Sequence, residues 1–217
     1  MTQTVAPLTP GAATDSRTAR KHQAILEAAE DVFLKGGYLG TNMDELAALS
    51  GVSKQTVYKH FGSKEALFVE LVTSMTANAG DRVHDEIPDP VDAAELPAYL
   101  LDYAERQLAI VLTPRLLQLR RLVIGEVSRF PALATALYDS GPRRAMASLT
   151  AVFTRLADRG LLRVEEPAVA AAHFNWLVMA EPLNAAMMLG DAAVPNPQEL
   201  HRHATEGVRI FMAAHRP

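Results

Sequence analysis

The chain of 217 residues has no cysteine and a single tryptophan. The absence of cysteine excludes a disulfide framework, a thiol nucleophile and any zinc site with cysteine ligands. It is typical of proteins in a reducing compartment, so we expect a cytoplasmic location. Aromatic residues are also sparse, at 6%.

Long hydrophobic runs are missing as well. The longest mostly apolar run, 168–180, includes His173 and Asn175. A membrane-spanning helix needs about 20 apolar residues, so we expect none. The first residues lack a basic stretch followed by an apolar stretch, and we expect no secretory signal there.

Motifs of catalysis are absent too. The sequence has no G-x-G-x-x-G, P-loop, H-E-x-x-H or G-x-S-x-G pattern. His201 and His203 are two residues apart, which places them on different faces of a helix. We therefore expect no catalytic residue, no metal and no cofactor.

Acidic residues outnumber basic ones overall, with a net charge of −4. Residues 1–64 nevertheless hold seven lysines and arginines against six aspartates and glutamates, whereas the remaining residues hold 14 against 19. Lys54, Lys59, His60 and Lys64 fall within eleven residues that contain no acid. A short basic surface on an acidic protein predicts an anion-binding site.

The hydrophobic pattern is helical throughout, and no segment shows a sustained period of two, so we predict an all-α protein with about nine helices. Residues 1–16 lack periodicity and are expected to form a flexible tail. We expect residues 17–78 to form a first domain and 79–217 a second. The acidic, proline-containing segment 79–95 is the expected linker.

Four helices are expected in the first domain. The first carries an apolar stripe and ends at Gly36-Gly37; the stripe is Ile25, Ala28, Ala29, Val32 and Phe33. Asn42, Ser53 and Ser63 are the expected N-caps of the next three. The fourth is expected to run from Lys64 to about Asn78.

Five helical stretches are expected in the second domain. They begin near Leu96, at Pro114, after Gly141-Pro142, near Pro167 and after Asn196-Pro197. The second is expected to continue to Phe130, and the fourth to be kinked at Pro182.

Two short helices joined by a tight turn, 43–61, indicate a helix-turn-helix, whose second helix enters the DNA major groove. Ala47 is small enough to let the helices approach, and Gly51 tolerates the left-handed turn. Val52 and Val57 can pack the pair together. The second helix then presents polar side chains: Lys54, Gln55, Thr56, Tyr58, Lys59 and His60.

The run TNMDELAALSGVSKQTVYKHFGSKEALF (41–68) resembles the DNA-binding segment of TetR-type one-component regulators. Its most specific part is Tyr-x-His-Phe-x-x-Lys-x-x-Leu after a helix that ends in Gly-Gly-Tyr. The resemblance covers residues 17 to 75 and implies a three-helix DNA-binding domain followed by a helical domain that binds an effector and dimerises.

The resemblance also implies roles for individual residues. Lys54, Gln55 and Thr56, which follow the N-cap Ser53, would read base edges, since lysine can donate to guanine and glutamine can pair with adenine. The positions expected to hold phosphates or approach the DNA backbone are Thr41, Asn42, Tyr58, Lys59, His60 and Lys64. Lys59 departs from the aromatic residue or arginine that is frequent there, which leaves the base sequence open.

Simpler interpretations exist for the same residues. Phe61 is expected in the core, and Tyr58 could lie there too. Lysines 54, 59 and 64 could form an ordinary solvated surface.

The last two helices of such proteins pair with their copies in a four-helix bundle. The matching stretches here are about 167–189 and 197–214. Residues 121–133 also look like the second domain of one repressor subgroup. A homodimer would set two recognition helices about 34–36 Å apart on a palindromic operator.

Pockets between helices are mostly apolar with a few polar groups. The candidate effector-binding residues are Tyr99, Tyr103, Gln107, Glu126, His173, Asn175 and Trp176. Each could equally be structural: Glu126 could pair with Arg120 or Arg121, and His173 and Asn175 could bond across a dimer interface. We expect a medium-sized apolar or aromatic effector.

The sequence therefore predicts a DNA-binding regulator, a repressor that a small molecule releases from its operator. Two other interpretations stay open. The protein could be an activator that recruits a partner, or a helical adaptor that does not bind DNA.

Overall fold

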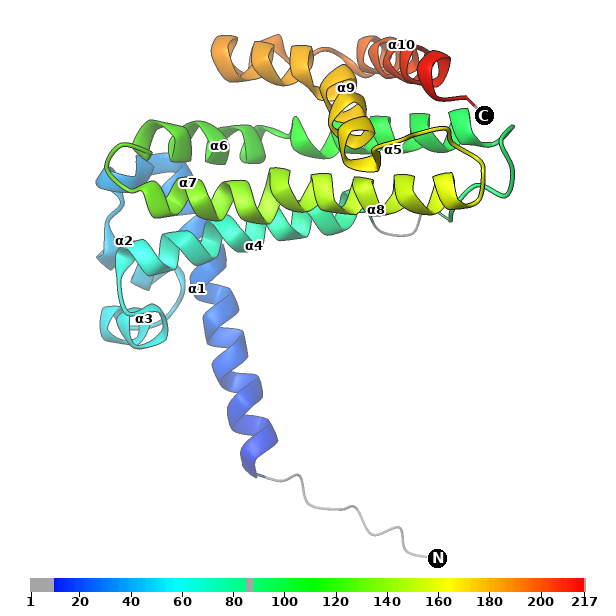
Figure 1. The fold of residues 1–217 in the computed structure, drawn as a ribbon. Coiled ribbons are helices and arrows are strands. Elements are labelled where there is room, and N and C mark those ends of the chain that lie inside the picture. The colour runs from blue at the N-terminus through cyan, green and yellow to red at the C-terminus, as the bar shows by residue number, and fades with distance from the viewer. Residues whose placement is uncertain (1–9, 85–87, 217) are drawn as a thin grey trace, which may run out of the picture. The chain divides into compact units, whose positions relative to one another are not determined.

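The computed structural model describes residues 10–84 and 88–216, and within them it contains helices and turns but no strand. The predicted all-α fold is confirmed (Figure 1). The helices are α1 (Pro10–Gly40), α2 (Met43–Leu49), α3 (Lys54–Phe61), α4 (Lys64–His84), α5 (Leu96–Val111), α6 (Pro114–Glu126), α7 (Pro131–Tyr138), α8 (Arg144–Asp158), α9 (Pro167–Leu189) and α10 (Pro197–His215). No helix in the described ranges is long and apolar enough to cross a membrane.

The chain divides into two compact units, residues 1–71 and 72–217. The division lies inside α4, between Leu71 and Val72. The long helix α4 therefore contributes its first turns to one unit and the rest to the other.

The first unit is built on the predicted stripe of α1. All five stripe residues are buried. The Phe33 ring stacks on Phe68 of α4 at 4.5 Å between centroids, and Tyr38 lies 5.3 Å from the same ring. Leu67, Phe68 and Leu71 are buried as the pattern of α4 predicts. Burial of these apolar side chains stabilises the frame that carries α2 and α3.

Two expectations for the N-terminal part need correction. Helix α1 begins at Pro10, so residues 10–16 are helical instead of a tail, and residues 1–9 lie outside the described residues. The expected stop at Gly36-Gly37 is a break at Gly37, where φ is +70°, after which the helix continues to Gly40.

The expected linker is shorter than predicted. Helix α4 continues to His84, and Val83 in its last turn is buried. The acidic composition of this stretch suggested a linker, but Thr76, Ala79 and Val83 keep helical spacing towards the second unit. Residues 88–95 are then held by α8, since Arg155 makes two hydrogen bonds to Asp89 at 3.0 and 3.1 Å.

The helix expected from Pro114 to Phe130 is shorter than predicted, and a further helix that was not predicted follows it. Helix α6 ends at Glu126, and Pro131 opens α7. Proline disfavours a helical conformation in the residue before it, and Phe130 is indeed non-helical. Gly141-Pro142, expected to separate two helices, instead lies in a π-helical turn, Asp139–Arg143, that joins α7 to α8.

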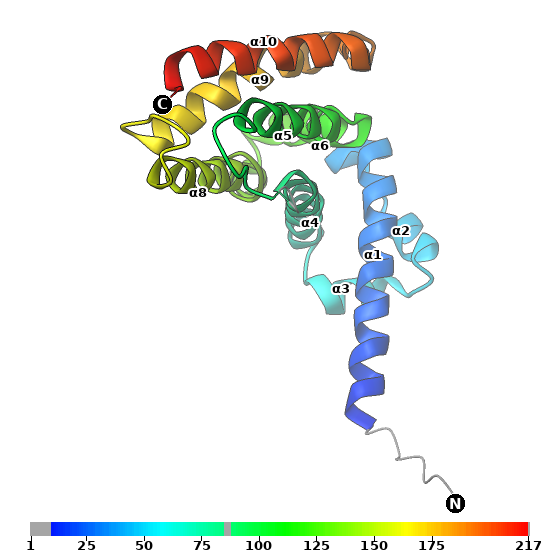
Figure 2. The same ribbon diagram turned by 90° about the vertical axis from the view of Figure 1, so that its right-hand side faces the viewer.

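The core of the second unit is aromatic. The rings of Phe153 (α8), Phe174 (α9) and Phe211 (α10) lie 5.1–5.8 Å apart between centroids. Helix α10 packs on α5 and α9, at the edge of this unit (Figure 2). Ala204 and Val208 are buried with Phe211. These three side chains of α10 therefore pack within their own chain, and the expected pairing of α9 and α10 with a second copy stays a prediction.

Candidate nucleic-acid interface

The turn between α2 and α3 has the geometry that a helix-turn-helix requires. Gly51 has φ +67°, a left-handed conformation that favours glycine. The Val52 N–H then donates to Ala47 O at 3.1 Å. Ser53 accepts from the Thr56 N–H at 3.1 Å and caps α3. Buried Ala47 and Val57 close the contact between the two helices.

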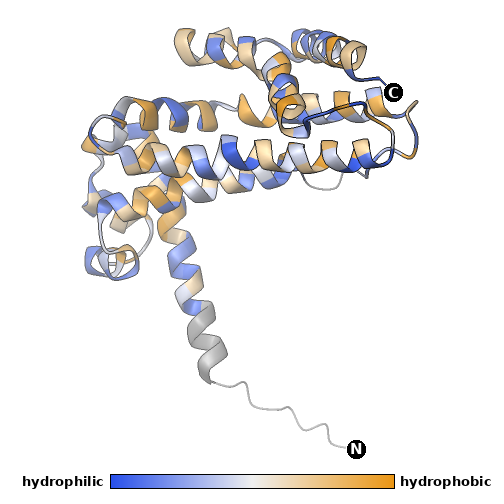
Figure 3. Cartoon of the chain, in the orientation of Figure 1, coloured by the Kyte–Doolittle hydropathy of each residue, from blue (hydrophilic) through white to orange (hydrophobic). Residues whose placement is uncertain are grey.

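Helix α3 buries one side and exposes the other. Val57 and Phe61 are buried, whereas the exposed residues are Lys54, Gln55, Tyr58 and Lys59. Figure 3 shows α3 coloured mostly as hydrophilic. Tyr58 is 38% exposed, which disfavours its interpretation as a core residue. The helix thus offers several hydrogen-bond donors on one solvent-facing surface.

Lys54 already has a partner on the preceding helix. Its Nζ lies 3.1 Å from Asp44 Oδ2, and both side chains are well exposed. An exposed pair of this kind contributes at most about 1 kcal/mol. Lys54 can therefore exchange Asp44 for a base edge at small cost.

Thr56 and His60 are half-buried. The Thr56 and Ser53 hydroxyls share a hydrogen bond of 2.8 Å, so Thr56 supports the cap. The His60 ring lies 6.0 Å from His22 of α1, which in turn stacks on Phe61 and pairs with Glu70 at 2.8 Å.

Thr41, Asn42 and Lys64 meet where α1, α2 and α4 come together. Asn42 is exposed and accepts from the Asp44 N–H as the cap of α2. Thr41 is only 6% exposed, and its hydroxyl donates to Gly37 O at 2.7 Å. The Thr41 side chain is therefore occupied within the protein, beside the break in α1, and its expected approach to the DNA backbone stays a prediction.

Lys64 is held by the backbone. Its Nζ donates to Thr41 O at 2.9 Å and to Leu39 O at 3.4 Å, and lies 5.2 Å from the centre of the Tyr38 ring. Burial lowers the pKa of this ammonium group. Two of its three donors are thus used inside the protein, which leaves one for a phosphate.

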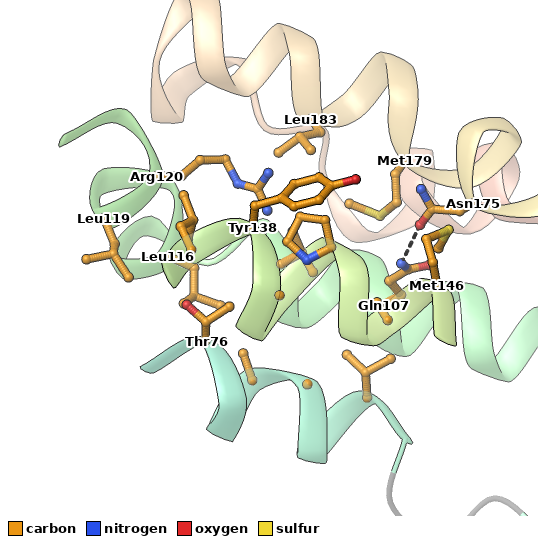
Figure 4. Close-up of a pocket in the computed structure, with 18 of the residues that line it drawn as sticks. Thr76, Gln107, Leu116, Leu119, Arg120, Tyr138, Met146, Asn175, Met179 and Leu183 are labelled. Atoms are coloured by element: carbon orange, nitrogen blue, oxygen red, sulfur yellow. Dashed lines mark hydrogen bonds between the residues drawn. The ribbon is translucent and has the colours of Figure 1, made fainter. Parts of the chain in front are cut away.

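A second candidate site is a cavity of about 390 Å³ within the second unit (Figure 4). Helices α4 to α9 contribute to its walls. Of the candidate effector residues, Gln107, Asn175 and Trp176 line it. Gln107 Nε2 donates to Asn175 Oδ1 at 2.8 Å, which ties α5 to α9.

The other effector candidates lie elsewhere. Tyr99 and Tyr103 line a smaller cavity with Arg155, and burial raises the pKa of both phenols. His173 lies in an outer hollow between α9 and α10. Glu126 does not line the large cavity, and it faces Arg129 at 3.6 Å instead of Arg120 or Arg121.

Sequence reasoning missed several residues of the large cavity, among them Thr76, Arg120, Tyr138 and Met146. Arg120 would ordinarily be assigned to the surface, and the helix that carries Tyr138 was not predicted. The remaining wall is largely apolar, with Leu116, Leu119, Met179 and Leu183. No group of three metal-ligating side chains comes together anywhere in residues 10–84 and 88–216.

Two family models match the chain. Residues 25–71 match the bacterial regulatory proteins of the tetR family, and residues 98–217 match the C-terminal domain of AefR-like transcriptional repressors. The second match covers more than half of the chain. The chain belongs to the TetR family.

Solved structures extend the TetR likeness over nearly the whole chain. A TetR-family transcriptional regulator from Mesorhizobium loti is 36% identical with a TM-score of 0.84, covering 93% of this chain and 99% of that one. The flavonoid-responsive regulator FrrA is 30% identical with a TM-score of 0.75, covering 92% and 98%.

Similarity to curated relatives is confined to shorter segments. The transcriptional repressor NicS of Pseudomonas putida is 33% identical over 91 residues, which are 40% of this chain and 43% of NicS. The match therefore spans less than half of that relative's length.

The helix-turn-helix and the family together make this chain a DNA-binding transcriptional regulator. Regulators of the TetR family bind DNA operators and act as dimers, and the family is not one of enzymes.

Proposed function

We propose that this regulator is a homodimeric repressor that binds a palindromic operator through α3 and leaves it when an apolar or aromatic effector fills the cavity of the second unit. It would act in the cytoplasm, on double-stranded DNA. The single observation that carries the proposal is that α4 belongs to both units: its first turns pack with α1, and its later turns line the cavity.

We assign the proposed DNA contacts according to how exposed each side chain is. Lys54 and Gln55, at the exposed start of α3, would read base edges. Tyr58, Lys59, His60 and Asn42 would position the protein on phosphates. Ser53 and Thr56 would hold the start of α3 in place. Lys64 would stabilise the junction of α1 and α2 and donate its remaining N–H to a phosphate.

The dimer contact would involve α9 and α10. Several large apolar side chains of these helices are exposed, namely Val169, Trp176, Met188, Leu189 and Ile210. An open hollow between the helices, lined by Trp176, Leu177 and Ile210 among others, lies on the same pair. Exposed apolar patches of this kind mark interaction sites.

Release would follow from a difference in affinity. An effector that binds better to the form with wrongly spaced recognition helices shifts the dimer towards that form. Each state would differ in the position of α4, since this helix borders the ligand. Differential binding of about 100-fold corresponds to roughly 2.7 kcal/mol.

Selection of bound sequences from random DNA tests the DNA half of the proposal. We expect a palindrome whose half-sites are about one helical turn apart. A strictly monomeric protein, or one that binds no double-stranded DNA even at low salt concentration, would contradict the proposal. A promoter reporter with and without the gene then separates repression from activation.

Thermal-shift screening tests the effector half. Flavonoids are sensible first compounds, because FrrA, a structural relative, is described as flavonoid-responsive. We expect apolar or aromatic compounds to stabilise the protein and to lower its operator affinity. Stabilisation by sugars, metal ions or nucleotides alone would refute the expected effector class.

A further inference from the structure

We propose that the effector of this regulator carries an anionic group, a carboxylate or a comparably acidic group, and that Arg120 binds this group inside the cavity. The inference rests on the proposed function and narrows it from an apolar or aromatic molecule to an apolar molecule with one negative end.

The position of Arg120 is the first observation. Its side chain comes from α6 and lines the cavity. Figure 4 shows the guanidinium group beside the ring of Tyr138, below Leu183 and above the Leu116 side chain. The residue is half-buried, and the burial of its guanidinium group lowers the pKa of that group. An arginine nevertheless stays protonated in proteins, so the cavity permanently holds one positive charge.

The second observation is that this charge has no counter-charge. Within the described parts of the chain, the Arg120 guanidinium makes no hydrogen bond or ion pair, and no aspartate or glutamate lines the cavity. The neighbouring Arg121, in contrast, donates to Asp191 at 2.5 Å and to Ala186 O at 3.0 Å. Burying a charge without a partner costs free energy, which a bound anion would recover.

The rest of the cavity defines the remainder of the ligand. Most of the wall is apolar, including Leu119, Met146 and Met179. At the side away from Arg120, the Gln107–Asn175 pair presents two amides (Figure 4). Gln107 Oε1 is buried and has no hydrogen-bond partner among the described residues. A ligand of matching polarity has a negative end at Arg120, an apolar middle and a neutral polar group near the amides.

The charge of the wall also indicates what the cavity rejects. A cationic compound of the same shape would face Arg120 with no carboxylate to offset the repulsion. Arginine moreover binds carboxylates through two parallel N–H donors, a geometry that a neutral amide cannot match.

Matched compounds test the inference on the full-length protein. We choose biphenyl-4-carboxylate, biphenyl-4-carboxamide and biphenyl-4-ylmethylammonium, with the corresponding naphthalene-2 series as a second shape. Isothermal titration calorimetry measures each affinity. We expect each carboxylate to bind about 10- to 100-fold more tightly than its amide, the range typical of a hydrogen bond to a charged group. We expect no binding of the ammonium compounds.

Variants then assign the preference to one side chain. Arg120→Met keeps an unbranched side chain but removes the guanidinium group. It should bring the ratio of carboxylate affinity to amide affinity close to one while the amide still binds. Arg120→Lys keeps the positive charge but lacks the two parallel N–H donors of a guanidinium group. It should therefore retain part of the preference for the carboxylate over the amide. Arg129→Met, at an exposed arginine outside the cavity, is the matched control and should keep the wild-type ratio.

Three results would overturn the inference: equal binding of carboxylate and amide to the wild type in both series, no carboxylate binding in either series, or a preference that survives in Arg120→Met. Operator binding, followed by fluorescence anisotropy, separates this failure from failure of the proposed function. Release of DNA by carboxylate and amide alike would leave ligand-gated repression standing and the anion site refuted. A carboxylate preference without release of DNA would support the anion site and refute ligand-gated repression.

Discussion

At the scale of single residues, two lysines of the first unit have different partners. The Lys54 ammonium pairs with an exposed aspartate, whereas the Lys64 ammonium donates to two backbone carbonyls. The first contact is easily exchanged, and the second joins separate helices. We therefore expect their removal to affect different properties of the protein.

For Lys54→Ala, we expect a relaxed preference at one operator position, with a loss of about 1–3 kcal/mol of discrimination there and little change in stability. Competition between operator variants measures this. Lys35→Ala, at an exposed position of α1 outside the helix-turn-helix, serves as the control. Unchanged discrimination at every operator position would contradict a base-reading role for Lys54.

For Lys64→Ala, we expect the free energy of unfolding to fall by roughly 1–2 kcal/mol, because two carbonyls lose their donor. Denaturant unfolding measures it, and Lys59→Ala, at an exposed side chain of α3, should leave stability unchanged. Equal stability of both variants would contradict a stabilising role for the hydrogen bonds from Lys64 to the backbone. The slope of log K for DNA binding against log salt concentration should also become smaller by about one, which would report the additional phosphate contact.

Asp89 gives a prediction for pH. The hydrogen bond and the charge of Arg155 hold the pKa of Asp89 below its usual range. A carboxyl with a depressed pKa in the folded state contributes stability above its ordinary pKa and loses it as pH falls through the folded value. We expect Asp89→Asn to cost up to about 1 kcal/mol at pH 7, since the pair is partly exposed. In urea unfolding, this difference should shrink below about pH 4; a difference that grows on acidification would contradict the pairing.

At the scale of elements, the π-helical turn Asp139–Arg143 lies close to α4. A Cβ atom at Gly141 would come within 2.6 Å of the Thr76 Cγ2 atom. Thr76 is buried, and its hydroxyl donates to Val72 O. Only glycine therefore allows the turn to approach the helix that connects the two units.

We expect Gly141→Ala to destabilise the protein by about 1–3 kcal/mol through overpacking and to weaken operator binding by displacing α4. Thr76→Ser removes the obstructing methyl group and keeps the hydroxyl, so the double variant should recover stability. Thr76→Ser alone is the control. Thermal unfolding and operator titration measure both effects, and failure of the second change to rescue the first would show that the close contact is not the cause.

The sequence predicts the boundaries of some helices better than those of others. Helices α5, α9 and α10 begin where Leu96, Pro167 and Asn196-Pro197 predict, because local caps and prolines determine those positions. The end of α4 and the division of α6 from α7 were missed. Val83 continues α4 because it is buried in the second unit, and this tertiary contact leaves no local signal.

The two candidate sites differ for the same reason. The residues of the helix-turn-helix are contiguous, so their motif could be recognised and their exposure on α3 follows from helical spacing. The cavity is assembled from segments far apart in the sequence. Arg120 could not be found in this way, because an arginine in an amphipathic helix ordinarily faces solvent.

At the scale of the whole molecule, the exposed apolar side chains of α9 and α10 predict how association and DNA binding are linked. We expect Ile210→Asp to shift the protein towards monomers and to lower operator affinity at least tenfold, because a charge in an apolar contact is costly. Analytical ultracentrifugation and operator titration measure both. Thr154→Asp, at an exposed position of α8, is the matched control. A variant that remains dimeric would place the contact elsewhere.

Trp176 occupies a position with a practical consequence. It is 64% exposed and lines both the cavity and the outer hollow between α9 and α10. Because the chain contains no other indole, its intrinsic fluorescence arises from this one side chain when excited at the red edge of its absorption. Emission from unmodified protein would thus report filling of the cavity as quenching or a spectral shift, and dissociation of a dimer as a change in the wavelength of maximum emission upon dilution.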